Sequence, residues 1–517
     1  MAAELYDEII PHIENSIYPS HLPVSEWKLK EGEITGANNR KFSDKSWSKF
    51  QVPGSWGKND KTFWFRQTVT VPAEWSGKPV VLLIDVPEGL LYLDGEPYHG
   101  IDANHNEILL TTKARTNQAF LLAIEAYSGR KNDLNKLHRS EIAVVDLTAK
   151  ALFHCLTTLH ELEEMYEHGS QESKTIRELI RRTLIFLKYF KPGSEEYPNA
   201  ISRAYMFLIN TMESEPQTSL PGIVHLVGQS HLDVAWLWSL HETKKKSGRT
   251  FSTALRLMEE FPLFKFSQSQ AVLYELTKDN YPSLYKQIKQ RVAEGRWEIA
   301  GSTWVEPDCN IPNGESLVRQ ILYGKRFFKT EFGTESNIVW LPDSFGFSWS
   351  LPQILRKSGI DFFFTTKLAW NDTTKFPYST FWWQGMDGTK ILAHQPPVGL
   401  EGSVKPKDIA KSWEEFLQKD QNCTNVLQTF GFGDGGGGPT STQIEASRVL
   451  RNSTGLPQSM ISTAKEFFTQ ASLQTDSLPT WNLDLYLEKH RGTFTTHGWI
   501  KKANRTAERQ LYESELL

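Results

Sequence analysis

A histidine and an aspartate two positions apart, His231 and Asp233, are the residues of this chain best suited to chemistry. They follow an apolar, β-branched run that predicts a buried strand of a parallel sheet, and Gly228 between run and pair permits a turn. If the backbone stays extended, both side chains project to one side at the strand's carboxyl end. This pair could supply half of a divalent metal site, with zinc as the first candidate. The alternative is a hydrogen-bonded histidine and aspartate in a polar loop.

Two further carboxylates, Asp343 and Asp434, could also take part in a site. Asp343 closes an apolar run and precedes small residues that leave room for a ligand, so it can reach His231 if their strands are neighbours. Its alternative role is a helix N-cap. Asp434 precedes four glycines, Gly435 to Gly438, which let a substrate approach the backbone closely. The run lacks the Gly-Lys-Ser/Thr ending of a phosphate loop, so an acid or base fits better.

The elements that position these residues alternate between strand and helix patterns over residues 221–480. Such alternation predicts a parallel sheet, closed into a barrel or open, with its site at the carboxyl ends of the strands. The polar residues expected around this mouth are His231, Asp233, Trp304, Glu306, Asp308, Asp343, Lys367 and Asp434.

The sequence patterns before and after residues 221–480 differ from this alternation. Residues 46–145 carry short apolar runs divided by turn signals such as Asp94-Gly95, which predict an antiparallel β-sandwich. Residues 1–45 predict a helix and a connector, and residues 146–220 a linker of two antiparallel helices. Residues 481–517 read as the start of a helical domain. Three tryptophans of the sandwich could line a sugar-binding face, although core packing is favoured: Trp56, Trp64 and Trp75.

The composition limits the number of domains, the classes of partner and the compartment that we expect for this protein. The chain has 517 residues, more than the roughly 250–300 at which one core stops growing, so several domains are expected. Its 57 Lys and Arg against 61 Asp and Glu give no basic excess, which argues against nucleic acid or a membrane surface. Three scattered cysteines favour a reducing compartment. Without a leader-like N-terminus or a long apolar run, a soluble, cytoplasmic protein is expected, with the vacuole as the alternative.

Five motifs carry a resemblance to a known family: HLDVAWLW, WVEPDCNIPNGESLVRQ, WLPDSFGFSWSLPQI, GFGDGGGGPT and HRGTFTTHGWIKKANR. Together they resemble glycoside hydrolase family 38, the retaining α-mannosidases, in its cytosolic and vacuolar branch. The resemblance implies a β-sandwich, a helical linker, an incomplete (β/α)7-like barrel and the start of a helical domain. It also implies hydrolysis of terminal α-linked mannose from free oligosaccharides or N-glycans, and a homo-oligomer in the full-length protein.

The same resemblance assigns roles to single residues. His231, Asp233 and Asp343 match zinc ligands, with cobalt as the alternative metal, and Asp343 also matches the nucleophile. Asp434 falls where the general acid/base is expected, and Trp236 matches an aromatic that stacks on mannose. These roles suit retaining chemistry, in which two carboxyls about 5–5.5 Å apart attack the sugar and protonate the leaving oxygen.

One feature departs from the family's pattern. The family's fourth zinc ligand, a histidine beyond the barrel, has no counterpart here, and His490 and His497 are expected to be structural or distal. The chain therefore resembles an N-terminal portion: a fragment, or a chain whose missing residues come from another. We expect it to hold metal poorly alone, to be inactive alone and to expose an apolar patch near its C-terminal helix. The alternative functions are a metal-dependent polysaccharide deacetylase and an inactive carbohydrate-binding fragment.

Overall fold

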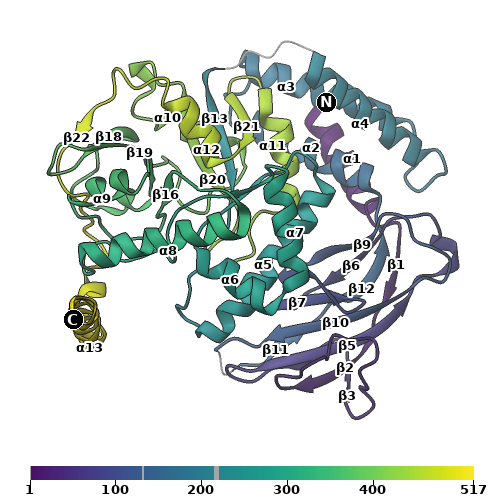
Figure 1. Ribbon diagram of the computed structural model, residues 1–517. Coiled ribbons are helices and arrows are strands. Elements are labelled where there is room, and N and C mark those ends of the chain that lie inside the picture. The colour runs from purple at the N-terminus through teal and green to yellow at the C-terminus, as the bar shows by residue number, and fades with distance from the viewer. Residues whose placement is uncertain (1, 131–132, 215–219) are drawn as a thin grey trace.

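The computed structural model describes residues 2–130, 133–214 and 220–517. It has an N-terminal β-sandwich, a group of helices and a mixed α/β region, and the last helix of the chain extends away from them (Figure 1). The predicted combination of a sandwich with an α/β region is therefore confirmed.

The sandwich consists of two antiparallel sheets, with strand orders β1-β12-β6-β9 and β3-β2-β5-β10-β7-β8. Their apolar faces enclose a core around Trp27, Phe65 and Leu122. The Asp94-Gly95 turn joins β7 to β8 with positive φ at both residues, as a two-residue hairpin requires. The strand bounds are β1 Ser20–Pro23, β2 Glu26–Glu31, β3 Ser48–Gln51, β4 Gly54–Trp56, β5 Thr62–Thr70, β6 Val80–Ile84, β7 Glu88–Leu93, β8 Glu96–Asp102, β9 Glu107–Thr111, β10 Ala119–Tyr127, β11 Asn135–Leu137 and β12 Ser140–Val144.

One expectation for this region was wrong. Strands β1 and β2 lie within residues 1–45, predicted as helix and connector, and they pair with β12 and with β3 and β5. Their short, charged sequences carry a weak strand signal, and the sheets supply the pairing partners. The core packing favoured for three tryptophans of the sandwich is confirmed, because all three are buried: Trp56, Trp64 and Trp75.

Four helices pack against the α/β region: α1 Ala2–Asn15, α2 Leu147–Glu164, α3 Gln171–Lys188 and α4 Tyr197–Ser214. The sequence predicted two helices after the sandwich, and the structure adds α4. Its Leu208 shares one hydrophobic cluster with Leu156 of α2, Leu184 of α3 and Val224 of the first α/β strand. These helices therefore share the core of the α/β region instead of forming a separate layer.

The α/β region is built on β13 (Leu220–Gly228), which lies between β20 (Asn425–Phe430) and β21 (Pro457–Ser462), parallel to both. An isolated parallel bridge between Gln229 and Ser267 joins it to β14 (Phe266–Gln268), which pairs with β15 (Trp297–Ile299). A third sheet holds β16 (Ile338–Trp340), β17 (Phe362–Phe364) and β19 (Lys390–His394) in parallel, with β18 (Thr380–Gln384) antiparallel to β19 and parallel to β22 (Thr480–Trp481). Parallel pairing of the strand before His231 is confirmed, and closure into a seven-stranded barrel stays a prediction.

The connecting helices are α5 Leu240–Glu260, α6 Ala271–Asn280, α7 Pro282–Ala293, α8 Gly314–Phe332, α9 Leu351–Lys357, α10 Pro406–Glu414, α11 Ser441–Val449 and α12 Ala464–Ala471. Pro282 separates α6 from α7, because proline lacks the N–H that would continue α6 and instead begins α7.

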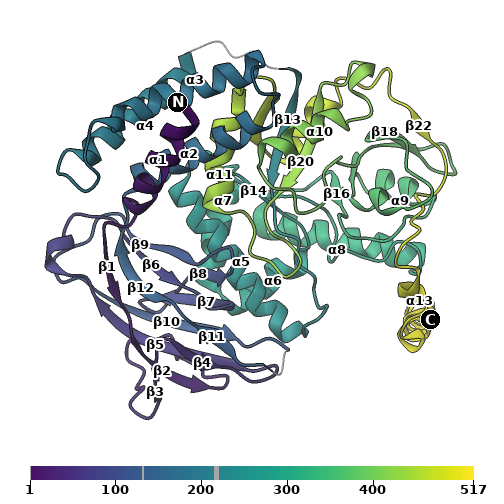
Figure 2. The ribbon, with the colours of Figure 1, turned by 180° about the vertical axis from the view of Figure 1, so that it is seen from behind.

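Helix α13 (Gly498–Leu516) lies at the edge of the molecule in both views (Figures 1 and 2), and its Glu515 pairs with Arg319 of α8. It exposes Trp499, Leu511 and Tyr512, in line with the apolar patch expected there. Across the described residues, no helix combines the length and apolar character needed to span a membrane.

Candidate active site

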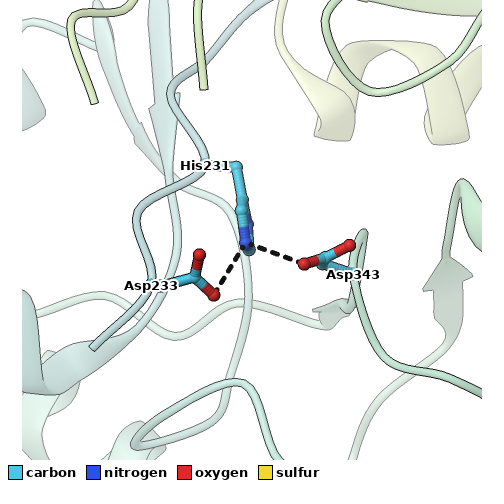
Figure 3. Close-up of side chains that lie close together, drawn as sticks. All are labelled: His231, Asp233 and Asp343. Atoms are coloured by element: carbon cyan, nitrogen blue, oxygen red, sulfur yellow. Dashed lines mark ion pairs between the residues drawn. The ribbon is translucent and has the colours of Figure 1, made fainter. Parts of the chain in front are cut away.

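His231, Asp233 and Asp343 meet at the carboxyl ends of two strands (Figure 3). The first two follow β13, and Asp343 follows β16. His231 Nε2 lies 3.5 Å from Asp233 Oδ1 and 3.4 Å from Asp343 Oδ2, and one ligand atom from each residue lies within 4.8 Å of the others. The side chains predicted to share one point are therefore brought together.

The donor set fits a metal ion. His231 Nε2 is buried and has no hydrogen-bond partner, a costly state for a ring nitrogen unless something occupies the space it faces. One imidazole nitrogen and two carboxylates are ligands that zinc accepts, with an open position for substrate. Burial lowers the pKa of His231, but the nearby carboxylates of Asp233 and Asp343 and the charge of Glu306 outweigh it and raise that pKa well above its ordinary value. The same negative field favours any bound cation.

Lys367 completes the surroundings of Asp343. Its Nζ forms an ion pair with Asp343 Oδ1, so the two carboxylate oxygens face different cationic partners, Lys367 and His231. Burial alone would raise the pKa of Asp343; His231 and Lys367 together lower it. Lys367 begins the 3-10 turn Lys367–Trp370, and its ammonium lies 3.4 Å from the centroid of the Trp370 ring. The sequence placed Lys367 at the mouth but assigned it no role.

Glu306 lies next to both His231 and Asp343. Its Oε1 accepts a 2.6 Å hydrogen bond from the backbone N–H of Asp343, and its Oε2 lies 3.5 Å from His231 Nδ1 without a hydrogen-bond partner. Burial raises the pKa of Glu306 to about 7, with His231 acting against the shift and Asp343 with it. The sequence named Glu306 only as one of several polar residues after a strand, and nothing there distinguished it from Asp308.

Two other residues expected at the mouth, Asp308 and Trp304, make different contacts. Asp308 accepts hydrogen bonds from the backbone of Asn310 and Ile311 and so holds its own turn. Trp304 packs edge-on against Phe327. Neither is in the metal-binding group that the described residues contain.

Asp434 lies on a glycine hairpin between β20 and α11. Phe432 and Gly438 exchange two 2.9 Å backbone hydrogen bonds that close the hairpin, and Asp434 and all four glycines have positive φ. Gly433 packs beside the metal-binding group: a Cβ on it would lie 3.2 Å from His231 Cβ. Asp434 itself is exposed, and its role as acid or base stays a prediction.

Aromatic rings border the site. Trp236 is 53% exposed and stands edge-on to Trp238, so a face of its indole is open to a ligand. His490 packs against Phe345 and Trp370, with ring centroids 4.8 and 5.4 Å apart. It is therefore closer to the mouth than expected for a distal residue, although outside the metal-binding group found among the described residues.

Comparison with known proteins gives one consistent result. Residues 221–484 match the glycosyl hydrolases family 38 N-terminal domain, and residues 18–143 match an α-mannosidase jelly roll domain. The chain is 35% identical over 492 residues to α-mannosidase G of Dictyostelium discoideum, covering 90% of this chain and 44% of that protein. It is 36% identical over 489 residues to human α-mannosidase 2C1, covering 90% and 46%. The chain thus spans less than half the length of these relatives.

Proposed function

The chain belongs to glycosyl hydrolase family 38, and we propose that the group around His231 is the active site of a retaining α-mannosidase. The substrate class is terminal α-linked mannose on free oligosaccharides or N-glycans. The observation that carries the proposal is the meeting of His231, Asp233 and Asp343 at strand ends within the matched domain.

Asp343 acts as the nucleophile. Its lowered pKa keeps the carboxylate ionised, and Lys367 fixes one of its oxygens. Its attack on the anomeric carbon forms a glycosyl ester as the bond to the leaving oxygen breaks. Asp434 gives its proton to that oxygen and then, as a base, takes a proton from the water that hydrolyses the ester.

His231, Asp233 and Asp343 would hold zinc, or cobalt as the alternative. A metal held there would supply a Lewis acid for the hydroxyls of mannose. The exposed ring of Trp236 provides a face on which the sugar stacks. Family membership favours this function over a polysaccharide deacetylase or a carbohydrate-binding protein without activity. Cytoplasmic location and a homo-oligomeric state remain parts of the proposal.

Covalent trapping tests the proposal directly. Because the chain alone is expected to be inactive, the test uses a zinc-loaded version extended to the length of its relatives. A fluorinated mannosyl fluoride, which slows hydrolysis of the intermediate, is incubated with it, and peptides are analysed by mass spectrometry. We expect one mannosyl adduct on Asp343 and none in Asp343→Asn. An adduct on a different carboxylate, or mannoside hydrolysis that survives Asp343→Asn, would overturn the assignment.

A further inference from the structure

The β-sandwich reaches across to the glycine hairpin that carries Asp434. His105, in the turn after β8, lies between the two regions and is buried. Its Nε2 donates a 2.9 Å hydrogen bond to the carbonyl of Pro439, directly after the hairpin. Its Nδ1 donates to the carboxylate of Asp102 at 2.9 Å. Because both ring nitrogens face acceptors, the ring is a doubly protonated imidazolium held between sandwich and hairpin.

The glycine hairpin packs tightly against His105 and Asp102. A Cβ on Gly437 would lie 3.0 Å from Asp102 Oδ2 and 3.3 Å from His105 Cε1. The His105 ring also meets the ring of Phe432 edge-on. Only a residue without a side chain lets the backbone come so close, and the φ of Gly437 is +104°.

Helix α5 provides a second line of support, itself fixed to the sandwich. Thr250 Oγ1 accepts a hydrogen bond from the backbone N–H of Gly437. Lys246 donates to the carbonyl of Gly435 and forms an ion pair with Glu88 of β7, which also pairs with Arg249. The residue before Lys246, Lys245, pairs with Glu125 of β10 at 3.0 Å. These buried charges hold α5 against the sandwich.

The hairpin needs such support because it has little of its own. Four consecutive glycines offer no side chains to pack, and glycine loses more backbone freedom on ordering than any other residue. On its other side, Glu401 accepts a hydrogen bond from the N–H of Gly433. Contacts from outside the hairpin therefore set where Asp434 stands.

We propose that His105 and Asp102 are positioning residues that the β-sandwich contributes to the active site, fixing the hairpin that presents Asp434. The inference rests on the proposed role of Asp434. On this view the sandwich is a structural part of the catalytic machinery, and its contact with Pro439 sets the geometry of the proton donor.

Hydrogen exchange of the hairpin amides, followed by mass spectrometry in peptides covering residues 431–440, tests positioning without any assay of activity. His105→Ala removes the donor to Pro439, and we expect about tenfold faster exchange there, the effect of losing one modest hydrogen bond. The matched control is Thr253→Val, which removes another hydrogen bond of the same interface, to the N–H of Gly100 on β8. Unchanged exchange in His105→Ala, or an equal increase in both variants, overturns the proposal.

Two more variants distinguish the loss of this hydrogen bond from general misfolding. His105→Gln keeps an N–H that can reach Pro439 and should restore most of the protection. Asp102→Asn keeps an acceptor but removes the negative charge that orients the ring, and should lose part of it. If His105→Gln protects no better than His105→Ala, the hydrogen bond is not what holds the hairpin.

Activity then separates this proposal from the assignment of Asp434. We expect His105→Ala to lower kcat more for a mannose disaccharide than for an aryl mannoside with a good leaving group, because the disaccharide needs the proton more. Faster hairpin exchange with equal loss on both substrates would uphold the positioning and overturn Asp434 as the acid.

Discussion

The ammonium group of Lys367 and the imidazole of His231 hold opposite oxygens of the Asp343 carboxylate. Lys367 is 5% exposed and Asp343 20% exposed, so water screens this pair only weakly. The carboxylate is therefore fixed in orientation as well as charge, which a nucleophile with one productive direction of attack requires.

Replacing Lys367 by Met should destabilise the fold through Asp343. We expect a loss of about 3 kcal/mol in the free energy of unfolding, because a buried charge is left with one partner fewer. Urea unfolding of both single variants and of the double variant with Asp343→Asn measures the coupling. Equal losses in the wild-type and Asp343→Asn backgrounds would show that the pair contributes nothing specific.

Removing His231 or Asp233 should weaken zinc binding by more than about 100-fold, since each is a direct ligand in the proposed set. Competition with a chromogenic chelator gives the affinity independently of activity. The matched control is His490→Ala, which removes a nearby histidine outside the metal-binding group of the described residues. A comparable loss in this control would mean that His490 also binds the metal.

Glu306→Gln should lower zinc affinity by about 10–100-fold, the range known for groups that orient a metal ligand. The substitution keeps an oxygen to accept from the Asp343 N–H but removes the negative charge that faces His231 Nδ1. Asp308→Asn, a neighbouring carboxylate that holds only its own turn, serves as the control. Unaltered affinity in Glu306→Gln would exclude this supporting role.

Asp434→Asn should slow the hydrolysis of mannose disaccharides far more than that of aryl mannosides with good leaving groups. The physical reason is that protonation assists a poor leaving group by about 10²–10⁴-fold and a good one much less. Steady-state kcat on both substrates, with Asp343→Asn as the variant that loses both, gives the comparison. A uniform loss in Asp434→Asn would remove it as the acid.

The His105–Asp102 pair predicts a dependence of stability on pH. Burial lowers the pKa of His105, but the hydrogen bond and charge of Asp102 outweigh it and leave the pKa above its ordinary 6.5. The stabilisation is therefore complete below about pH 6.5 and is lost as pH rises through the folded pKa. We expect the difference in melting temperature between wild type and His105→Gln to shrink from pH 6 to pH 9. A constant difference would contradict a charged His105.

Strand patterns predict only that His231, Asp233 and Asp343 follow apolar runs at strand ends, where the carboxyl ends of parallel strands meet at one mouth. Their assignment to one metal site came from the resemblance to the family. The same reasoning brought Glu306 and Lys367 to the mouth but could not show which atoms they touch. Those contacts depend on how loops from different strands fold against each other.

Other features escaped for similar reasons. Strands β1 and β2 are short and polar, and only their partners in the sheets make them strands. The boundary between α6 and α7, by contrast, does have a local signal in the sequence, Pro282. The contact between His105 and Pro439 joins residues 334 positions apart, and no local pattern signals it.

The row of cations on α5 also bears on how such a protein can evolve. Lys245, Lys246 and Arg249 are buried and pair with carboxylates of the sandwich, and Arg249 also pairs with Glu242 of α5 itself. A recombination event that exchanged the sandwich for an unrelated module would leave three positive charges facing a surface not made for them. We therefore expect the two regions to be inherited as one unit, and substitutions at Glu88 or Glu125 to persist only alongside compensating changes on α5.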